Sequence, residues 1–320
     1  MRKLLRRETA LLLVLIGLFA VFSFSVDGFF NWINILDRAR YWVVPGMIAV
    51  AMTFIIATAG IDLSVGSILA LSGIALGLLF RDGQWPIALA IGGAIFTGTA
   101  AGAFNGFAIG FLRIPPLVVT LATMALFRGI AMGLSQGKQF GGYPDGFEWI
   151  SQGDLLTLRG PASVSIPTPI LALVIVVLAG SLLLRRTWIG RFTELLGENP
   201  VAARFAAIDV RWLTFGLYTA CGAVCGVAAL FHTALYASAK ADTAMGMELE
   251  AIACVVVGGT RISGGKGSVL GTLLGLLIIG ILRYGLEMAG VKSVYVVILV
   301  GILLVTTAVF NEWAAARESQ

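Results

Sequence analysis

Residues 258–271 read GGTRISGGKGSVLG, a glycine-rich run with one lysine whose composition suits phosphate binding. A nucleotide-binding P-loop has the spacing G-x-x-x-x-G-K-[ST], because its glycine amides surround the phosphates and its hydroxyl binds Mg²⁺. Counted back from Gly265 and Lys266, the position of the first required glycine holds Thr260. The position after the lysine, which must be Ser or Thr, holds Gly267. The spacing therefore argues against a nucleotide site, and the glycines need another explanation.

Catalytic and metal-binding motifs are missing from the sequence. The one histidine, His232, lies in an apolar stretch, where packing is a commoner role than ligation. No C-x-x-C pair, G-x-S-x-G or H-E-x-x-H occurs, so we expect no catalytic residue, no metal, no cofactor and no enzyme activity. Two cysteines stand beside Gly222 and Gly226, and this small-residue pattern predicts a helix-packing seam. The three cysteines are Cys221, Cys225 and Cys254.

The composition predicts a membrane protein. Of the 320 residues, 58% are hydrophobic and 12% are charged, about half the charged fraction of a soluble domain. In lipid every backbone group must be paired internally, so the spans are helices and the fold is all-α and polytopic, a single domain over 1–320. Eight segments with few or no charges are near or above spanning length: 9–26, 41–61, 63–80, 86–112, 168–184, 212–235, 267–282 and 293–311. Two shorter apolar segments, 115–134 and 249–260, bring the expected number of spans to ten.

The basic residues predict the orientation. The N-terminal cluster Arg2, Lys3, Arg6 and Arg7 places the start inside, and ten crossings return the C-terminus to the cytoplasmic side. The start resembles a secretory signal but lacks a convincing cleavage site, so we expect an uncleaved first span. The net charge of +5 is then a topology signal, and no nucleic-acid partner is expected.

Two long loops connect the spans. The inner loop, 185–211, contains a short polar helix that begins with Asn199 as N-cap and Pro200 as first residue. Its alanines suit close contact with a partner surface better than lipid anchoring. The outer loop, 135–167, is either a plain connector or a docking surface for an external partner. It is rich in Gly and Pro and also holds Phe140, Tyr143, Phe147 and Trp149.

Two glycine-containing stretches predict broken or re-entrant segments, near 60–67 and 249–267. Irregular backbone survives at membrane depth only where it lines a cavity or is buried in protein. In GIDLSVGSILALSG, Asp62 or Ser64 can cap the following helix. Both stretches end in Gly-Ser before an apolar helix, which indicates either an internal repeat or two unrelated turns. Few charges lie in the spans: Arg128, and Arg283 with Glu287, whose one-turn spacing predicts an ion pair.

Three motifs together carry a family resemblance: GIDLSVGS, GENPVAARFAAIDV and ELEAIACVVVGGTRISGGKGS. In this order and spacing, they resemble the inner-membrane permeases of bacterial sugar ABC importers, of the ribose, xylose, arabinose, galactoside, rhamnose and autoinducer-2 type. The resemblance extends from the first span to residue 311. It implies a second permease, two cytoplasmic ATPase domains and a periplasmic sugar-binding protein, with this chain in the bacterial inner membrane. ATP would then bind a different chain, which agrees with the lack of P-loop spacing in residues 258–271.

The resemblance also implies residue roles. The inner loop would carry the helix that seats in the ATPase: Gly197, Glu198, Asn199, Pro200, Ala202, Ala203, Arg204 and Ile208. The family often has Ser-Gly where this chain has Ala206-Ala207, which leaves the local turn open. The glycines expected to act as a hinge are Gly258, Gly259, Gly264, Gly265 and Gly267. The residues expected along the translocation path, each with helix packing as its alternative role, are Asp62, Ser64, Ser67, Asn105, Thr120, Thr123, Arg128 and Glu250.

Two other transport functions stay open from the sequence. A branched-chain amino-acid permease shares the architecture, although the wording of GIDLSVGS favours sugars. An ion-coupled secondary sugar carrier would need a coupling site, and the sequence shows no chain of intramembrane Asp, Glu and His. The outer loop is somewhat similar to that of the rhamnose and autoinducer-2 branch. The particular sugar, and the choice between a homodimer and a heterodimer, are not readable.

Overall fold

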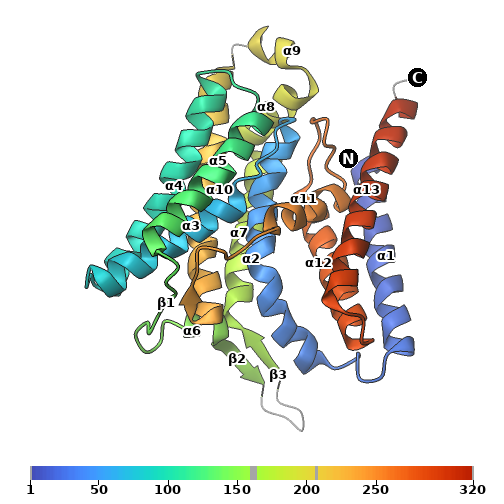
Figure 1. Cartoon of the computed structure of the whole chain (residues 1–320). Coiled ribbons are helices and arrows are strands. Elements are labelled where there is room, and N and C mark those ends of the chain that lie inside the picture. The colour runs from blue at the N-terminus through green and yellow to red at the C-terminus, as the bar shows by residue number, and fades with distance from the viewer. Residues whose placement is uncertain (1, 159–163, 206–207, 319–320) are drawn as a thin grey trace.

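The computed structural model describes residues 2–158, 164–205 and 208–318 and is predominantly helical (Figure 1). The helices in chain order are α1 (Arg2–Ser25), α2 (Trp32–Ala57), α3 (Val65–Gly77), the π-helical η1 (Leu78–Asp82), α4 (Ile87–Gly110), α5 (Pro116–Ser135), α6 (Trp149–Gln152), α7 (Thr168–Arg186), α8 (Trp188–Glu198), α9 (Pro200–Phe205), α10 (Val210–Tyr236), α11 (Met247–Val257), α12 (Val269–Met288) and α13 (Ser293–Glu318). The strands are β1 (Phe140–Gly141), β2 (Asp154–Leu158), β3 (Val164–Pro167) and β4 (Ser238–Ala239).

The helices confirm a polytopic membrane fold. Among the described residues, eight helices, α3 counted with η1, are long and apolar enough to cross a bilayer, and the apolar part of α13, Ser293–Val309, adds a shorter one. Helix α11 has 11 residues and a length of about 16 Å, roughly half of a 30 Å hydrocarbon core. Helix α11 is therefore too short to span a bilayer by itself, and irregular chain flanks it on both sides, as expected for a broken segment. Both termini lie toward the end of the molecule that carries α8 and α9 (Figure 1).

The opposite end carries the two small sheets (Figure 1). β2 and β3 form an antiparallel hairpin, and β1 pairs with β4 through Phe140 opposite Ala239. The segment predicted as an outer loop is thus partly folded, and its β1 joins the end of α5 to the end of α10. Phe140 and Phe147 are buried, whereas Trp149 is 54% exposed. Phe140 and Phe147 are therefore packing residues, whereas Trp149 is available at the surface.

The predicted small-residue seam is present between α4 and α10. A methyl group added at Gly98 would lie 2.5 Å from the carbonyl oxygen of Gly222 and 2.8 Å from the Cα of Gly226. Gly102 lies equally close to Gly222. Close backbone approach of this kind maximises packing between helices in lipid, where the hydrophobic effect supplies no driving force between them. The seam fixes α10 against α4 and thereby places the residues described next.

Candidate functional site

The first irregular segment, 58–64, is organised around a fully buried carboxylate. Asp62 Oδ1 accepts hydrogen bonds from the backbone N–H of Ser64 at 2.8 Å and from its hydroxyl at 2.6 Å. The same hydroxyl accepts a hydrogen bond of 2.8 Å from Asn105 Nδ2 on α4. Ser64 makes no side-chain cap to α3, so Asp62 stabilises the turn before the helix rather than the helix itself. The segment is thus tied to α4.

Further hydroxyl groups hold this segment from α5 and α3. Thr120 Oγ1 donates to the carbonyl of Ile61 at 3.1 Å, and Ser67 Oγ donates to the carbonyl of Ser64 at 2.7 Å. Thr123 bonds only within its own helix, to Thr120. Six predicted path residues are therefore buried, and all but Thr123 take part in the hydrogen bonds around this turn: Asp62, Ser64, Ser67, Asn105, Thr120 and Thr123. Within the described chain, Asp62 Oδ2 and Asn105 Oδ1 have no hydrogen-bond partner.

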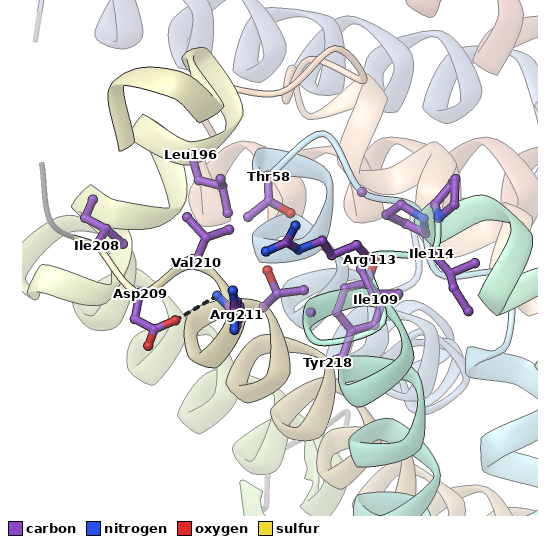
Figure 2. A pocket seen from close by; sticks show the side chains of 15 residues that line it. Thr58, Ile109, Arg113, Ile114, Leu196, Ile208, Asp209, Val210, Arg211 and Tyr218 are labelled. Carbon is purple, nitrogen blue, oxygen red and sulfur yellow. Dashed lines mark hydrogen bonds between the residues drawn. The ribbon is translucent and has the colours of Figure 1, made fainter. Parts of the chain in front are cut away.

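A cavity of about 700 Å³ lies beside this cluster, at the end of the molecule that carries α8 (Figure 2). Figure 2 shows Arg113 and Arg211 reaching into it from the α4–α5 connection and from α10. Tyr218 lies at its base, and a methyl group at Gly60 would come within 2.8 Å of the Tyr218 hydroxyl oxygen. The cavity therefore adjoins the turn at Asp62. Its remaining lining residues are Thr58, Ile109, Gly110, Ile114, Pro115, Pro116, Leu196, Ile208, Asp209, Val210 and Thr214.

Sequence reasoning did not find this cavity. None of the predicted path residues lines it, and of the predicted ATPase-coupling residues only Ile208 does. In the sequence, Arg113 was identified only as a basic residue of an inner connection. Nothing about Tyr218 indicated a cavity, because a tyrosine is common in an apolar span. The cavity depends on how α2, α4, α8 and α10 meet, which no local pattern encodes.

The predicted inner-loop helix is present as α9, next to α8. Asn199 Oδ1 accepts hydrogen bonds of 3.0 Å from the backbone N–H groups of Val201 and Ala202, which confirms the N-cap. Ala203 and Ile208 are buried in a small apolar cluster with Leu196 and Leu213, so they support the helix rather than offer a surface. The side chain of Arg204, and the residues Ala206-Ala207, lie outside the described part of the chain.

The exposed face of this loop consists of different residues. Phe205 is 87% exposed and Val201 is 60% exposed. Glu198, Asn199 and Pro200 are exposed beside them, and Gly197 and Ala202 are half-buried. An exposed aromatic ring at the tip of a polar loop is available for a protein contact. Sequence reasoning missed Phe205 and Val201 because it carried over only the residues that matched the family motif.

The glycine-rich segment makes a backbone contact with both α2 and α8. The backbone N–H of Gly265 donates to the carbonyl of Ala57, the last residue of α2, at 2.9 Å. A methyl group at Gly197 would overlap the same carbonyl oxygen and lie 2.5 Å from Gly265 N. Gly264 has φ +89°, a conformation that favours glycine, and its missing Cβ leaves room for Ala59. We call this contact of Gly197, Ala57 and Gly265 the backbone junction.

The other predicted hinge glycines have separate roles. A methyl group at Gly258 would overlap the backbone of Gly271, so Gly258 brings α11 close to α12. Gly259 has φ +93° in the turn that ends α11. The backbone N–H of Gly267 donates to Glu194 Oε1 on α8 at 3.4 Å. Burial raises the pKa of Glu194, and this hydrogen bond from Gly267 opposes the rise.

The two Gly-Ser pairs occupy different places. Gly66-Ser67 lies inside the first turn of α3, whereas Gly267-Ser268 precedes α12. Ser268 Oγ accepts a hydrogen bond from Gly271 N at 3.0 Å and caps that helix. The pairs are therefore not equivalent positions of a local repeat.

Arg128 holds the other end of α11. Its Nη1 donates to the carbonyl oxygens of Ala241 and Thr243, both at 2.6 Å, and so binds the segment between β4 and α11 to α5. The start of α3 meets this segment, because a methyl group at Gly66 would lie 2.6 Å from the carbonyl oxygen of Ala244. The hydrogen bonds of Arg128 do not reach the turn at Asp62. They hold the segment before α11, and this segment packs against α3, the helix that follows that turn.

The predicted ion pair between Arg283 and Glu287 is wrong. Arg283 pairs with Glu250 of α11 at 3.2 Å, and Glu287 pairs with Arg38 of α2. One-turn spacing places two charges on one helix face, but here each charge reaches a neighbouring helix instead. Glu250, the remaining predicted path residue, therefore links α11 to α12.

Comparison with known proteins shows which family and which relatives this chain resembles. Residues 34–308 match the family described as "Branched-chain amino acid transport system / permease component". The chain belongs to this permease family. It is 34% identical to the autoinducer 2 import system permease protein LsrD of Klebsiella pneumoniae, over 99% of this chain and 95% of that protein. It is 35% identical to the ribose import permease protein RbsC of Escherichia coli, over 93% and 91%, and of Bacillus subtilis, over 94% and 92%.

Proposed function

We propose that this permease forms the passage of an ATP-binding-cassette importer for a monosaccharide or a related small polyol, of the rhamnose, pentose or autoinducer-2 type. The support is the near full-length similarity to permeases named for ribose and for autoinducer 2. Glycines and neutral hydroxyl side chains, which suit a neutral polar solute, surround the turn at Asp62. A branched-chain amino acid is the alternative substrate, on the wording of the family description.

The observation that carries the proposal is the backbone junction. A cytoplasmic ATPase that moves α8 and α9 has to move Gly197, whose backbone is in contact with Ala57 and Gly265. Ala57 directly precedes the irregular segment 58–64, and Gly265 lies within the irregular segment 258–268. Close-packed backbone transmits a displacement rather than absorbing it. ATP binding would therefore open the passage outward by shifting both segments, and hydrolysis would return them.

The proposal assigns partners and orientation. The end with α8 and α9 faces the cytoplasm of a bacterial inner membrane, and the ATPase contacts the exposed Val201 and Phe205. The end with β2 and β3 faces the periplasmic binding protein. A second permease, identical or related, completes the passage. The cavity beside Arg113 and Tyr218 is the inner vestibule through which the solute leaves.

The test is to purify the tagged chain gently from its own host and to identify the proteins that accompany it. We expect an ATPase with the wild-type chain and with Trp149→Asp, a matched control at the opposite end. We expect the ATPase no longer to accompany Phe205→Asp, because this substitution replaces an aromatic anchor in the interface by a charge. If no ATPase accompanies the wild type, and vesicle uptake stops with a protonophore but survives ATP depletion, the chain is an ion-coupled carrier.

A further inference from the structure

A second cavity, of about 560 Å³, lies on the outside of the helix bundle, between α7 and α10. Helix α2 forms its floor through Phe54, α7 and α10 form its walls through Leu183 and Leu217, and α8 closes one end through Phe192. We call this cavity the side groove. Among the described lining residues Asp209 is the one with a charge, and its carboxylate already accepts a hydrogen bond from the backbone N–H of Arg211 at 3.2 Å. The side groove is therefore an apolar site.

Small residues make the groove wide. On α10 the wall includes Gly216 and Ala220, both exposed, and on α7 it includes Ala179 and Gly180. A Cβ at Gly216 would meet no other atom within 4 Å, so glycine is not required there for packing within this chain. An apolar cavity of this size holds no ordered water. At membrane depth, the groove is instead available to the acyl chain of a lipid.

The end of the groove near α8 has the features of a membrane interface. Trp188 and Trp212 lie there and are 56% and 60% exposed, and tryptophan is enriched at the level of lipid headgroups. Arg186 and Arg191 flank Trp188 in the sequence, are exposed, and form no ion pair or hydrogen bond with the described part of the chain. Their neighbour Arg185, by contrast, pairs with Glu8 at 2.7 Å. Two unpaired cations at this depth attract an anionic headgroup.

We infer that the side groove binds one anionic phospholipid of the leaflet on the α8 side. One acyl chain fills the groove over Gly216 and Ala220, and the phosphate lies between Arg186 and Arg191 near the two tryptophans. Because Ile189 and Phe192 of α8 close the groove, the bound lipid fixes α8 against α7 and α10. The lipid thereby supports the helix whose Gly197 enters the backbone junction.

The test is native mass spectrometry of the purified chain with dioleoyl phosphatidylglycerol and dioleoyl phosphatidylcholine. We expect one tightly bound phosphatidylglycerol and about 30-fold weaker binding of phosphatidylcholine, since two basic residues near an anionic lipid each contribute. Gly216→Leu, whose Cβ meets no other atom within 4 Å, places a side chain in the groove and should abolish the bound lipid. Its control is Gly301→Leu on α13, where a Cβ also meets open space.

A second pair of variants tests the headgroup separately. Arg186→Gln with Arg191→Gln should bring phosphatidylglycerol down to the level of phosphatidylcholine, whereas Lys138→Gln with Lys292→Gln, at the opposite end, should not. Equal retention of the two lipids by the wild-type chain would overturn the proposal. Unchanged phosphatidylglycerol binding in Gly216→Leu, or in the arginine double variant, would overturn it as well. The arginines are exposed, so this second arm does not depend on how the glycine variant folds.

Discussion

The backbone junction predicts that Gly197→Ala separates ATP hydrolysis from transport. The added methyl group would overlap the carbonyl oxygen of Ala57 and approach Gly265 N to 2.5 Å. Carbon contacts are optimal at about 3.5–4.0 Å, so the backbones of α8 and α2 must separate by about 1 Å or more. The methyl group would also press on both atoms of the 2.9 Å hydrogen bond from Gly265 N to Ala57 O, so that bond is lost as well.

The size of the effect follows from these two losses. Overpacking at a close contact costs about 1–3 kcal/mol, and the lost backbone hydrogen bond adds about 0.5–1.5 kcal/mol. Together they destabilise the closed junction by roughly 1.5–4.5 kcal/mol, which changes its population by about tenfold to about two-thousand-fold. The exposed face of α9 is untouched, so the ATPase should still bind Gly197→Ala. Uptake per ATP hydrolysed should fall by at least about tenfold.

The assay is uptake and ATP hydrolysis by the reconstituted complex in proteoliposomes, together with the melting temperature of each variant. Gly301→Ala is the open-space control and should behave as wild type. Gly102→Ala is the packed control, since its methyl group would press on the α4–α10 seam but not on the junction. The reasoning is refuted if Gly197→Ala transports like the wild type, or if it loses hydrolysis and uptake in the same proportion as Gly102→Ala does.

Three further predictions concern charged groups. Arg128→Gln should lower uptake about tenfold or more, because two charge-assisted hydrogen bonds to carbonyls are lost, while Arg128→Lys recovers part of it in the same assay. A double-mutant cycle of Glu250→Gln and Arg283→Gln, read by melting in detergent, should give a coupling of about 0.5–3 kcal/mol; a coupling of zero would contradict the ion pair. Burial raises the pKa of Glu194, so the unfolded chain releases this proton first, and stability falls as the pH rises from the unfolded to the folded pKa. Thermal melting against pH should show that fall in the wild type and in Glu148→Gln, an exposed control at the opposite end of the molecule, but not in Glu194→Gln.

Features that depend on local composition could be predicted from the sequence. The spans follow from the low density of charged residues. The cap at Asn199 follows because its side-chain oxygen can accept from the free backbone N–H groups two and three residues later. The seam at Gly222 follows from the same logic, since small residues one turn apart offer a close-packing face. Each of these predictions depends only on residues that lie within a few helical turns of one another in the sequence.

Features that depend on a second element could not be predicted. Glu287 is one turn from Arg283, yet it pairs with Arg38, which is distant in the sequence. Ser64 was one of two possible helix caps, but its hydroxyl donates to Asp62 and accepts a hydrogen bond from Asn105 of α4, and it makes no cap to α3. In both places a side chain from another helix supplies the partner, instead of the local group that the sequence pattern predicts.

The glycines of 258–267 show how this limit applies to function. Spacing excluded a phosphate site and the sequence predicted a broken, hinge-like segment, but the backbones that these glycines approach could not be predicted because they belong to distant elements. In the structure, Gly264 and Gly265 have φ of +89° and +96°, and Gly265 thereby directs its N–H to α2 rather than to a ligand. A phosphate loop and this segment use the same property, a backbone freed from Cβ. What differs is the acceptor, which here is the carbonyl oxygen of Ala57.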